Sequence, residues 1–382
     1  MPEPLKNFFS PTIVTQLAED LTRAHPSFPR RAFVRAATAG LADLELLARG
    51  RHIASALSAH LPPNYPDAID VLLRSLGSEH ATDELVGAGM APFFYLPHVL
   101  FVAERGLDHF DLSMRAQYEL TKRFSAEVSI RAYIEKAPEQ TCAVLRKWAT
   151  DDHAHVRRLV SEGTRLRLPW TPRVAWLDDH PERVLELLEL LKDDPTTLVR
   201  RSVANNLNDL GKVHPELLVD TCDAWMRDPS ATRCALVEHA LRSAVKRGEP
   251  GALKILGFDK RPAIEIQGAR FDPAKVAIGD RVVTSFTLRS TTRTPQRLLL
   301  DLRVHFVKAN GKPSPKVFKL ARIELAGRQA RELSSSVSLA VHTTRKPYPG
   351  EHRVELLANG TALPLGSFTV VDSQRARAKR HR

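Results

Sequence analysis

Apolar residues recur every three or four positions through the first two thirds of the chain, which is the spacing of amphipathic helices. Breaks at His25-Pro26, Gly50 and Pro62-Pro63 separate these segments into pairs. The pattern therefore predicts helical hairpins. The expected helices cover residues 12–18, 32–48, 53–61, 68–76, 97–105, 113–134, 138–149, 155–162, 181–191, 198–207, 215–227 and 231–246.

One part of this region occurs twice. Val156-Arg157-Arg158 returns as Val199-Arg200-Arg201, 43 residues later, and each copy follows an acidic turn. This spacing is typical of HEAT-like repeats, in which stacked helix pairs bury one apolar face against their neighbours. We therefore expect a mainly α fold, a HEAT-like helical-repeat solenoid over residues 1–258.

After about Lys260 the apolar residues alternate with polar ones instead, and Gly, Pro, Asn and Ser punctuate the segments. Seven short strands are expected, and they favour an immunoglobulin-like all-β sandwich over residues 259–372. Gly257-Phe-Asp-Lys260 is the predicted linker, and residues 373–382 form a basic tail that we expect to be disordered. The strands are predicted at residues 263–266, 281–288, 297–307, 316–325, 331–341, 352–357 and 365–371.

The formal net charge of +12 is unevenly distributed. Residues 1–260 hold 33 Lys and Arg against 35 Asp and Glu, whereas residues 261–382 hold 23 against 9. An anionic partner is therefore expected to meet the β-domain, although the basic tail serves solubility equally well. The three cysteines, Cys142, Cys222 and Cys234, include no CxxC pair and favour a reducing compartment. Without a secretory segment or membrane span, a cytoplasmic protein is expected.

Three acidic residues of the helical region have apolar neighbours in their helices: Glu127, Glu162 and Asp209. Glu162 lies six residues after Val156, Asn205 lies six residues after Val199, and Asp209 lies ten after it. A carboxylate in such a place is more often a solvated edge residue or the partner of an arginine. Acids on the inner helices of successive repeats would nevertheless converge on one concave surface, which favours a functional site.

The arginines form a second set. The inner arginines of the Val-Arg-Arg pairs are assigned first to bonding the aspartate of the repeat turn. Arg165 and Arg167 lie next to Glu162 and Trp170, and a cation beside an aromatic ring suits phosphate contact and stacking on an opened base pair.

Metal chemistry has little support. Asp152-His153-Ala-His155 and the pairs Glu79-His80 and Glu238-His239 could ligate iron or zinc, but no second motif completes a site. No P-loop, dinucleotide fingerprint or serine-nucleophile elbow is visible either. We therefore expect neither a metal nor a cofactor.

Five segments resemble the AlkC family of bacterial alkylpurine DNA glycosylases, and residues 156–170 are the most specific of them. The β-domain is similar to the immunoglobulin-like module of one AlkC subtype and is absent from the related AlkD proteins. The segments are Leu5-Lys-Asn-Phe-Phe, Phe93-Phe-Tyr-Leu-Pro97, Leu120-Thr-Lys-Arg-Phe-Ser-Ala-Glu127, Val156-Arg-Arg-Leu-Val-Ser-Glu-Gly-Thr-Arg-Leu-Arg-Leu-Pro-Trp170 and Val199-Arg-Arg-Ser-Val-Ala-Asn-Asn-Leu-Asn-Asp209.

The resemblance implies a monofunctional DNA glycosylase that acts without metal or cofactor. It would excise cationic alkylated bases, chiefly 3-methyladenine and also 3-methylcytosine, from double-stranded DNA in base excision repair. By motif position Glu127, Glu162 and Asp209 would be the active-site acids. The resemblance also implies that the duplex is bent against the helical face rather than losing its lesion to a deep pocket. The residues expected to contact DNA are Arg158, Arg165, Arg167, Trp170 and Arg201.

A monomer bound to the nucleoid is expected, with the basic β-domain contacting the phosphate backbone, so that deleting residues 261–382 would weaken binding and flatten its salt dependence. Two alternatives stay open at this point. A non-catalytic HEAT-like scaffold with a β-sandwich docking module would have no DNA turnover for the three acids to support. A metal-dependent HEAT-like hydroxylase would carry bound iron.

Overall fold

The computed structural model describes residues 4–80, 89–258, 261–341 and 346–372. The predicted tail at 373–382 and linker residues 259–260 lie outside the described residues. Contacts divide the chain into two compact units, the first made of Met1–Leu218 and Arg227–Ala240, the second of Val219–Met226 and Leu241–Arg382. Helices continue to Ile255 and strands start at Ile264. The predicted domain boundary after residue 258 therefore stays a prediction.

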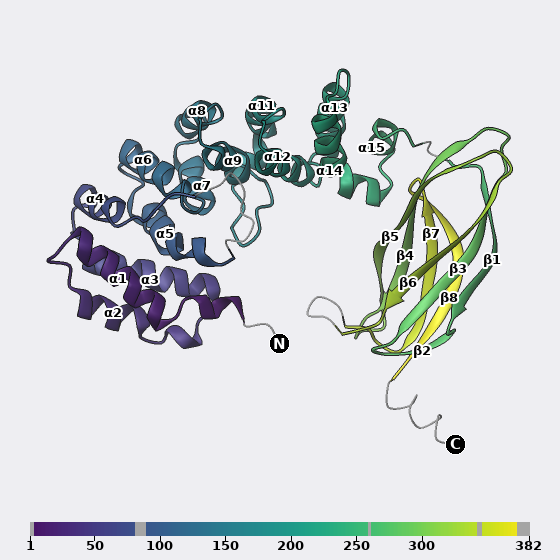
Figure 1. Cartoon of the computed structure of the whole chain (residues 1–382), viewed down its shortest axis with the longest axis horizontal. Coiled ribbons are helices and arrows are strands. Elements are labelled where there is room, and N and C mark those ends of the chain that lie inside the picture. Colours follow the sequence, from purple (N-terminus) through teal and green to yellow (C-terminus); the bar gives the residue numbers. More distant parts are fainter. Residues whose placement is uncertain (1–3, 81–88, 259–260, 342–345, 373–382) are drawn as a thin grey trace. The chain divides into compact units, whose positions relative to one another are not determined.

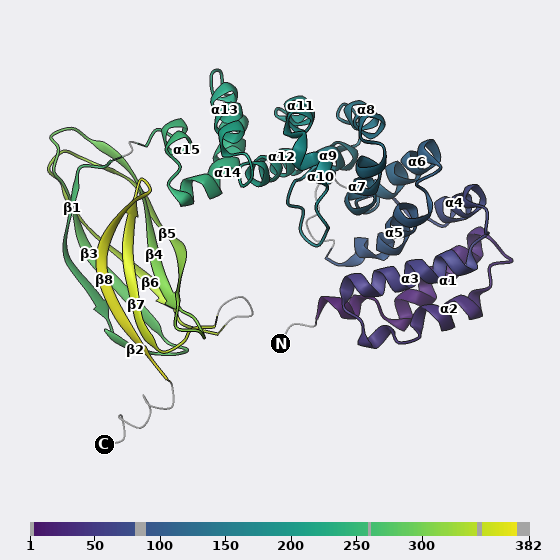
Figure 2. The ribbon, with the colours of Figure 1, turned by 180° about the vertical axis from the view of Figure 1, so that it is seen from behind.

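The helical region is built of antiparallel pairs, as predicted (Figures 1 and 2). Short 3-10 turns, η1 (Leu5–Phe8), η2 (Leu41–Asp43) and η3 (Ala91–Tyr95), lie between some of the helices. The α-helices are α1 (Pro11–Ala24), α2 (Arg30–Thr38), α3 (Leu46–His60), α4 (Tyr65–Arg74), α5 (Leu96–Arg105), α6 (Phe110–Thr121), α7 (Glu127–Lys136), α8 (Pro138–Trp148), α9 (Ala154–Gly163), α10 (Ala175–Asp179), α11 (Pro181–Leu191), α12 (Thr197–Leu210), α13 (Pro215–Trp225), α14 (Ala231–Arg247) and α15 (Pro250–Ile255).

Helices α3, α5, α7, α9 and α12 form one layer in which each helix contacts the next, and α4, α6, α8 and α11 lie along the other side (Figure 1). The close approach of α7 and α9 depends on Gly163. A Cβ atom at this position would lie 2.5 Å from Cγ2 of Ile130. The layer of inner helices is the one that carries Glu127, Glu162 and Asp209.

Two of the predicted helices are wrong in their limits. Residues 32–48 do not form one helix, because α2 ends at Thr38 and α3 starts at Leu46. Gly50 is not a break but a buried residue inside α3, where an added Cβ would meet Leu96 Cδ2 at 2.9 Å. The predicted helix at 113–134 is likewise two helices, α6 and α7, separated by a turn in which Ala126 N donates to Thr121 Oγ1.

The acidic turn of each repeat is held by an arginine from the following helix, as the Val-Arg-Arg pattern predicts. Arg157 Nε donates to Asp194 Oδ2 at 2.6 Å, and Arg157 Nη1 donates to the carbonyl oxygen of Asp151 at 2.8 Å. In the next repeat, Arg200 Nη1 donates to the carbonyl oxygen of Pro195 at 2.7 Å. Arg157 therefore links the turn of its own repeat to the turn of the following one.

The β-region is a sandwich of two sheets, and the immunoglobulin-like prediction is confirmed. The three-stranded sheet has the order β1-β3-β6 and the five-stranded sheet the order β2-β8-β7-β4-β5. Phe286, Leu302 and Phe368 lie in the core between them. The strands are β1 (Ile264–Asp272), β2 (Lys275–Ala277), β3 (Arg281–Ser290), β4 (Gln296–Val307), β5 (Pro313–Leu325), β6 (Ala330–Ser338), β7 (Gly350–Ala358) and β8 (Thr361–Val371).

All seven predicted strands are found, and β2 is an additional one. It spans three residues and pairs in parallel with β8. A strand this short shows no alternation in the sequence, so the period-2 pattern could not reveal it.

The burial of the Arg157–Asp194 ion pair predicts how much stability the fold loses when the pair is broken. The side chains are only 12% and 3% exposed, so Arg157→Ala leaves Asp194 as an uncompensated buried charge. We expect the free energy of unfolding to fall by about 3 kcal/mol, measured by urea denaturation. The matched control is Arg183→Ala, which breaks a solvent-exposed pair with Glu139 and should cost about 0.5 kcal/mol or less. Equal losses in the two variants would contradict the assignment.

Candidate functional site

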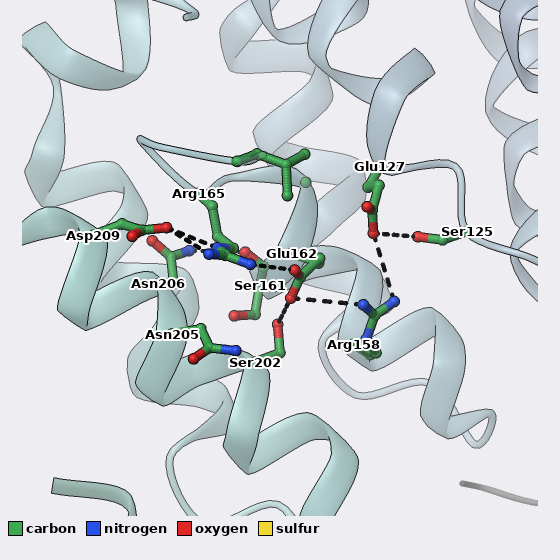
Figure 3. A network of polar contacts seen from close by, with 12 residues as sticks. Ser125, Glu127, Arg158, Ser161, Glu162, Arg165, Ser202, Asn205, Asn206 and Asp209 are labelled. Carbon is green, nitrogen blue, oxygen red and sulfur yellow. Dashed lines mark hydrogen bonds and ion pairs between the residues drawn. The ribbon is translucent and has the colours of Figure 1, made fainter. Parts of the chain in front are cut away.

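The three predicted acids lie in one connected network of charges (Figure 3). Glu127 is the first residue of α7, Glu162 lies in the last turn of α9, and Asp209 lies in the last turn of α12. Two arginines join them. Arg158 Nη1 lies 3.6 Å from Glu127 Oε2, and Arg158 Nη2 lies 3.8 Å from Glu162 Oε2. Arg165 Nη1 lies 2.5 Å from Glu162 Oε1, and Arg165 Nη2 lies 2.8 Å from Asp209 Oδ2. The convergence predicted from the repeat is therefore present.

Side chains from two successive repeats donate hydrogen bonds to Glu162. Arg165 Nη1 donates to Oε1, and Ser202 Oγ on α12 donates to Oε2 at 2.6 Å. The side chain is 7% exposed. Burial acts to raise the pKa of Glu162, but the positive charges of Arg158 and Arg165 outweigh it and lower the pKa below its ordinary value. Glu162 is thus a fixed, ionised carboxylate.

Glu127 has a different environment. Ser125 Oγ donates to Oε2 at 2.9 Å, and the side chain keeps 26% exposure. Burial raises the pKa of Glu127, and Arg158 opposes that effect without cancelling it. The nearby charge of Glu162 raises the pKa further. The two glutamates therefore differ in acidity, and Glu127 is the better base of the two.

Asp209 is the most buried of the three acids. Its side chain is 2% exposed, and it accepts from Arg165 Nε at 2.8 Å and from Lys212 Nζ at 2.7 Å. Asp209 therefore reaches Glu162 through Arg165 rather than directly.

Beside Glu127 lies a recess of about 260 Å³. Its walls are largely apolar and include the rings of Phe93, Phe124 and Trp170. The polar lining residues are Arg51, Ser125, Glu127, Arg158 and Thr171. Trp170 is 62% exposed although it is apolar, and its φ of 66° lies in the left-handed region. A bulky residue held in that region marks a constrained loop of a kind that often carries function.

The arginines predicted to contact DNA occupy three different settings. Arg158 and Arg165 lie within the acid network, at 16% and 12% exposure. Arg167 donates to Asp178 on α10 at 2.7 Å and takes no part in the network. Arg201 is exposed and lines a separate groove. DNA contact by these residues and by Trp170 stays a prediction.

The sequence pattern did not single out Ser202, Lys212 and Ser125. Ser125 was visible as the neighbour of Glu127 in the Phe-Ser-Ala-Glu segment. Ser202 and Lys212 offer no comparable signal, because a hydroxyl or a lysine on a helix gains its role only from the repeat packed against it.

The histidines near residues 80 and 155 contact one another and Glu79. The rings of His80 and His155 stack with centroids 4.3 Å apart, and His153 Nε2 lies 3.9 Å from Glu79. Among the described residues, no group of three or more His, Cys, Asp and Glu side chains could hold a metal ion. In the same part of the chain, no helix is long and apolar enough to cross a membrane.

The chemistry of this cleft suits a cationic ring. A fixed carboxylate attracts positive charge more strongly in a partly dry site than in water. Aromatic faces attract cations as well. A second carboxylate with a raised pKa can accept a proton from a water molecule.

The comparisons with known proteins agree with this chemistry. Residues 124–245 match the family of DNA alkylation repair enzymes, and residues 265–372 match the C-terminal Ig-like domain of the uncharacterised protein YhaZ. The chain is 31% identical to YhaZ from Bacillus subtilis over 373 residues, covering 96% of this chain and 99% of that protein. Fold and site together thus define a helical-repeat protein of DNA alkylation repair.

A solved structure narrows the class to one family. The Pseudomonas fluorescens alkylpurine DNA glycosylase AlkC, bound to DNA containing an abasic site analog, is 34% identical, with a TM-score of 0.88. The match covers 97% of this chain and all of that chain. The chain belongs to the AlkC family of DNA glycosylases, and the resemblance noted in the sequence is confirmed.

The opposite pKa shifts of the two glutamates predict different pH dependences of stability. The folded pKa of Glu162 is lowered, so its stabilising contribution is complete above pH 4.5 and is lost as the pH falls through the folded pKa. The folded pKa of Glu127 is raised, so its ionisation destabilises the fold as the pH rises above 4.5.

Urea denaturation of the wild type, Glu127→Gln and Glu162→Gln from pH 4.5 to about pH 8 tests this difference. The wild type should lose stability relative to Glu127→Gln as the pH rises. The difference in stability between the wild type and Glu162→Gln should change less with pH, because Glu127 still titrates in that variant, with a pKa that is raised less. Two parallel profiles would show that the environments do not separate the glutamates.

Proposed function

We propose that the protein hydrolyses the N-glycosidic bond of cationic alkylated bases in double-stranded DNA, with 3-methyladenine and 3-methylcytosine as substrates. The observation that carries the proposal is Glu127 in an apolar recess with three aromatic rings, joined through Arg158 to the ionised Glu162. The similar AlkC from Pseudomonas fluorescens, whose structure contains DNA with an abasic site analog, supports DNA as the partner. We infer a monomer that acts at the nucleoid.

The reaction passes through a sugar with oxocarbenium character. An alkylated base already carries a positive charge and leaves as a neutral molecule, so it needs no general acid. Glu162 stabilises the positive charge that develops on the sugar, because its own charge is fixed in place before the bond breaks.

Glu127 is the group we assign to the attacking water. Its raised pKa makes it a stronger base than Glu162, and Ser125 and Arg158 fix its carboxylate. Asp209 acts through Arg165, whose guanidinium it orients toward Glu162. The three acids thus have three roles: charge stabilisation, water activation and positioning.

Specificity follows from the same charges. A cationic base in the recess is attracted by Glu127 and by the faces of Phe93, Phe124 and Trp170, whereas a neutral base gains little from either. The recess is open to the solvent at Trp170, which is consistent with a lesion that stays near its duplex.

The first test is release of 3-methyladenine from methylated DNA by the wild type and by Glu162→Gln, with EDTA present throughout. We expect release by the wild type and a loss of about a hundredfold or more in the variant, because the preorganised charge is gone. The matched control is Glu186→Gln on α11, an exposed acid outside the network, which should keep full activity. No release by folded wild type would refute the glycosylase proposal.

The second test concerns the basic β-region. Arg270, Arg281 and Arg289 are exposed and alternate with the core residues Phe271, Val282 and Leu288, so they lie on the outer face of the three-stranded sheet. We propose that this face binds phosphates. Changing the three arginines to Ala should weaken DNA binding and flatten the slope of log K against log salt by about 0.9 for each phosphate that is no longer neutralised.

The control set is Lys308, Lys312 and Arg353, which are exposed elsewhere on the sandwich. Changing these three residues to Ala removes the same net charge. Fluorescence anisotropy over a range of salt concentrations measures both sets. Equal slopes for the two triple variants would show that net charge alone matters and that no face is specific.

A further inference from the structure

Arg131 on α7 is a buried arginine that the function proposed above does not use. It is only 4% exposed. It lies four positions after Glu127, so both side chains start from the same face of the helix. Burial lowers the pKa of Arg131 to about 10, which leaves the guanidinium charged at neutral pH. A buried cation thus lies one helical turn from an acid of the recess.

The guanidinium binds the main chain of the α9–α10 loop (residues 164–174) near both of its ends. Arg131 Nη1 donates to the carbonyl oxygen of Gly163 at 3.2 Å and to that of Arg165 at 2.8 Å. Nη2 of the same side chain donates to the carbonyl oxygen of Pro172 at 3.0 Å. Gly163 is the last residue of α9. Arg131 therefore ties the start of the loop to a point close to its end.

The placement of this cation costs free energy. Its hydrogen bonds to described residues all go to carbonyl oxygens, so none of them pairs the buried charge with a carboxylate. Arg131 Nε is buried and has no hydrogen-bond partner among the described residues. An apolar side chain of similar length would avoid both costs. The arginine is therefore better explained by the loop that it holds than by the stability of α7.

The loop that Arg131 holds carries Trp170. This residue lies between Arg165 and Pro172, with its backbone in the left-handed region and its side chain 62% exposed. Burial of the indole therefore does little to fix its position. Trp170 and Glu127 line the same recess. Since Glu127 and Arg131 both belong to α7, one helix carries a carboxylate of the recess and also holds the loop of an aromatic wall.

We propose that Arg131 is a positioning residue for the cationic base, because it holds the two ends of the α9–α10 loop together and keeps Trp170 at the recess. The inference rests on the proposed function, which places that base in the recess. A guanidinium suits this task, because its planar fork donates to several carbonyl oxygens in fixed directions. The ammonium of a lysine is a single point and would not tie both ends of the loop.

A double-mutant cycle tests whether Arg131 acts through Trp170. Release of 3-methyladenine is measured in single turnover for wild type, Arg131→Lys, Trp170→Ala and the double variant. Trp170→Ala should slow release about fivefold, as expected when one cation–ring contact is lost, and Arg131→Lys should slow it by no more than that factor. The double variant should be no slower than Trp170→Ala, because the position of the loop matters only while the indole is present. Losses that multiply would overturn the proposal, as would full activity in folded Arg131→Lys.

Time-resolved fluorescence anisotropy of the free protein follows the loop without any turnover. The signal of Trp170 is the difference between each protein and its Trp170→Phe counterpart. We expect the amplitude of its nanosecond motion to rise in Arg131→Lys and in Arg131→Gln, because the loop is no longer tied at both ends. Arg131→Gln buries no charge, so it serves where Arg131→Lys does not fold. Unchanged motion of Trp170 in a folded variant would contradict the proposal.

The matched control is Arg157→Lys. Arg157 is also a largely buried arginine, and it donates to the carbonyl oxygens of Asp151 and Asp152 in a repeat turn. These three are not among the described residues that line the recess. Arg157→Lys should lower stability in urea but keep the wild-type rate of release and the wild-type motion of Trp170. If it reproduces both effects of Arg131→Lys, a general loss of stability explains them and the proposal falls.

The two levels of inference can fail separately. A folded wild type that releases no base would overturn the proposed function, and with it the role of Arg131 toward the base, even where the anisotropy shows that Arg131 holds the loop. Release by the wild type together with unchanged Trp170 motion in the Arg131 variants would overturn only the role of Arg131.

Discussion

The site depends on the burial of Arg165 between two carboxylates that come from successive repeats. Glu162 belongs to α9 and Asp209 to α12, and the guanidinium binds both of them at 12% exposure. Removing Arg165 takes from both buried carboxylates a cationic partner, which is costly in a poorly hydrated place. The same interactions therefore fix the distance between two repeats and the charge state of the cleft. A substitution that changes the charge of the cleft therefore also changes the stability of the fold.

The repeat explains how two similar helices can carry different charges. Where α9 carries Arg158 and Glu162, two carboxylates flank the arginine, which the proposed function uses for a positively charged base. Where α12 carries Arg201 and Asn205, an amide stands in place of the glutamate, and its oxygen lies 3.1 Å from His239 Nε2. Divergence at single positions of two similar helices is enough to make this difference, because the repeat itself fixes where each side chain points.

Much of this architecture could be predicted from periodicity. The helical pairs, the sandwich and the convergence of Glu127, Glu162 and Asp209 all follow from spacings that each face of an element must satisfy. Gly50 was misread because a glycine that permits close packing against Leu96 looks like one that ends a helix. The burial of Asp209 and the role of Ser202 could not be predicted. Both depend on which side chain of the next repeat faces them, and the period of a single helix does not contain that information.

The backbone conformation of Trp170 costs the fold free energy. A side chain with a Cβ atom in the left-handed region costs about 1–2 kcal/mol, and glycine would adopt the same backbone freely. The exposed indole gains little from burial to offset that cost. A chain shaped for stability alone would not place tryptophan in this loop. The proposed role of Trp170 therefore sets stability against activity, and efforts to make the protein more heat-resistant should begin away from this loop.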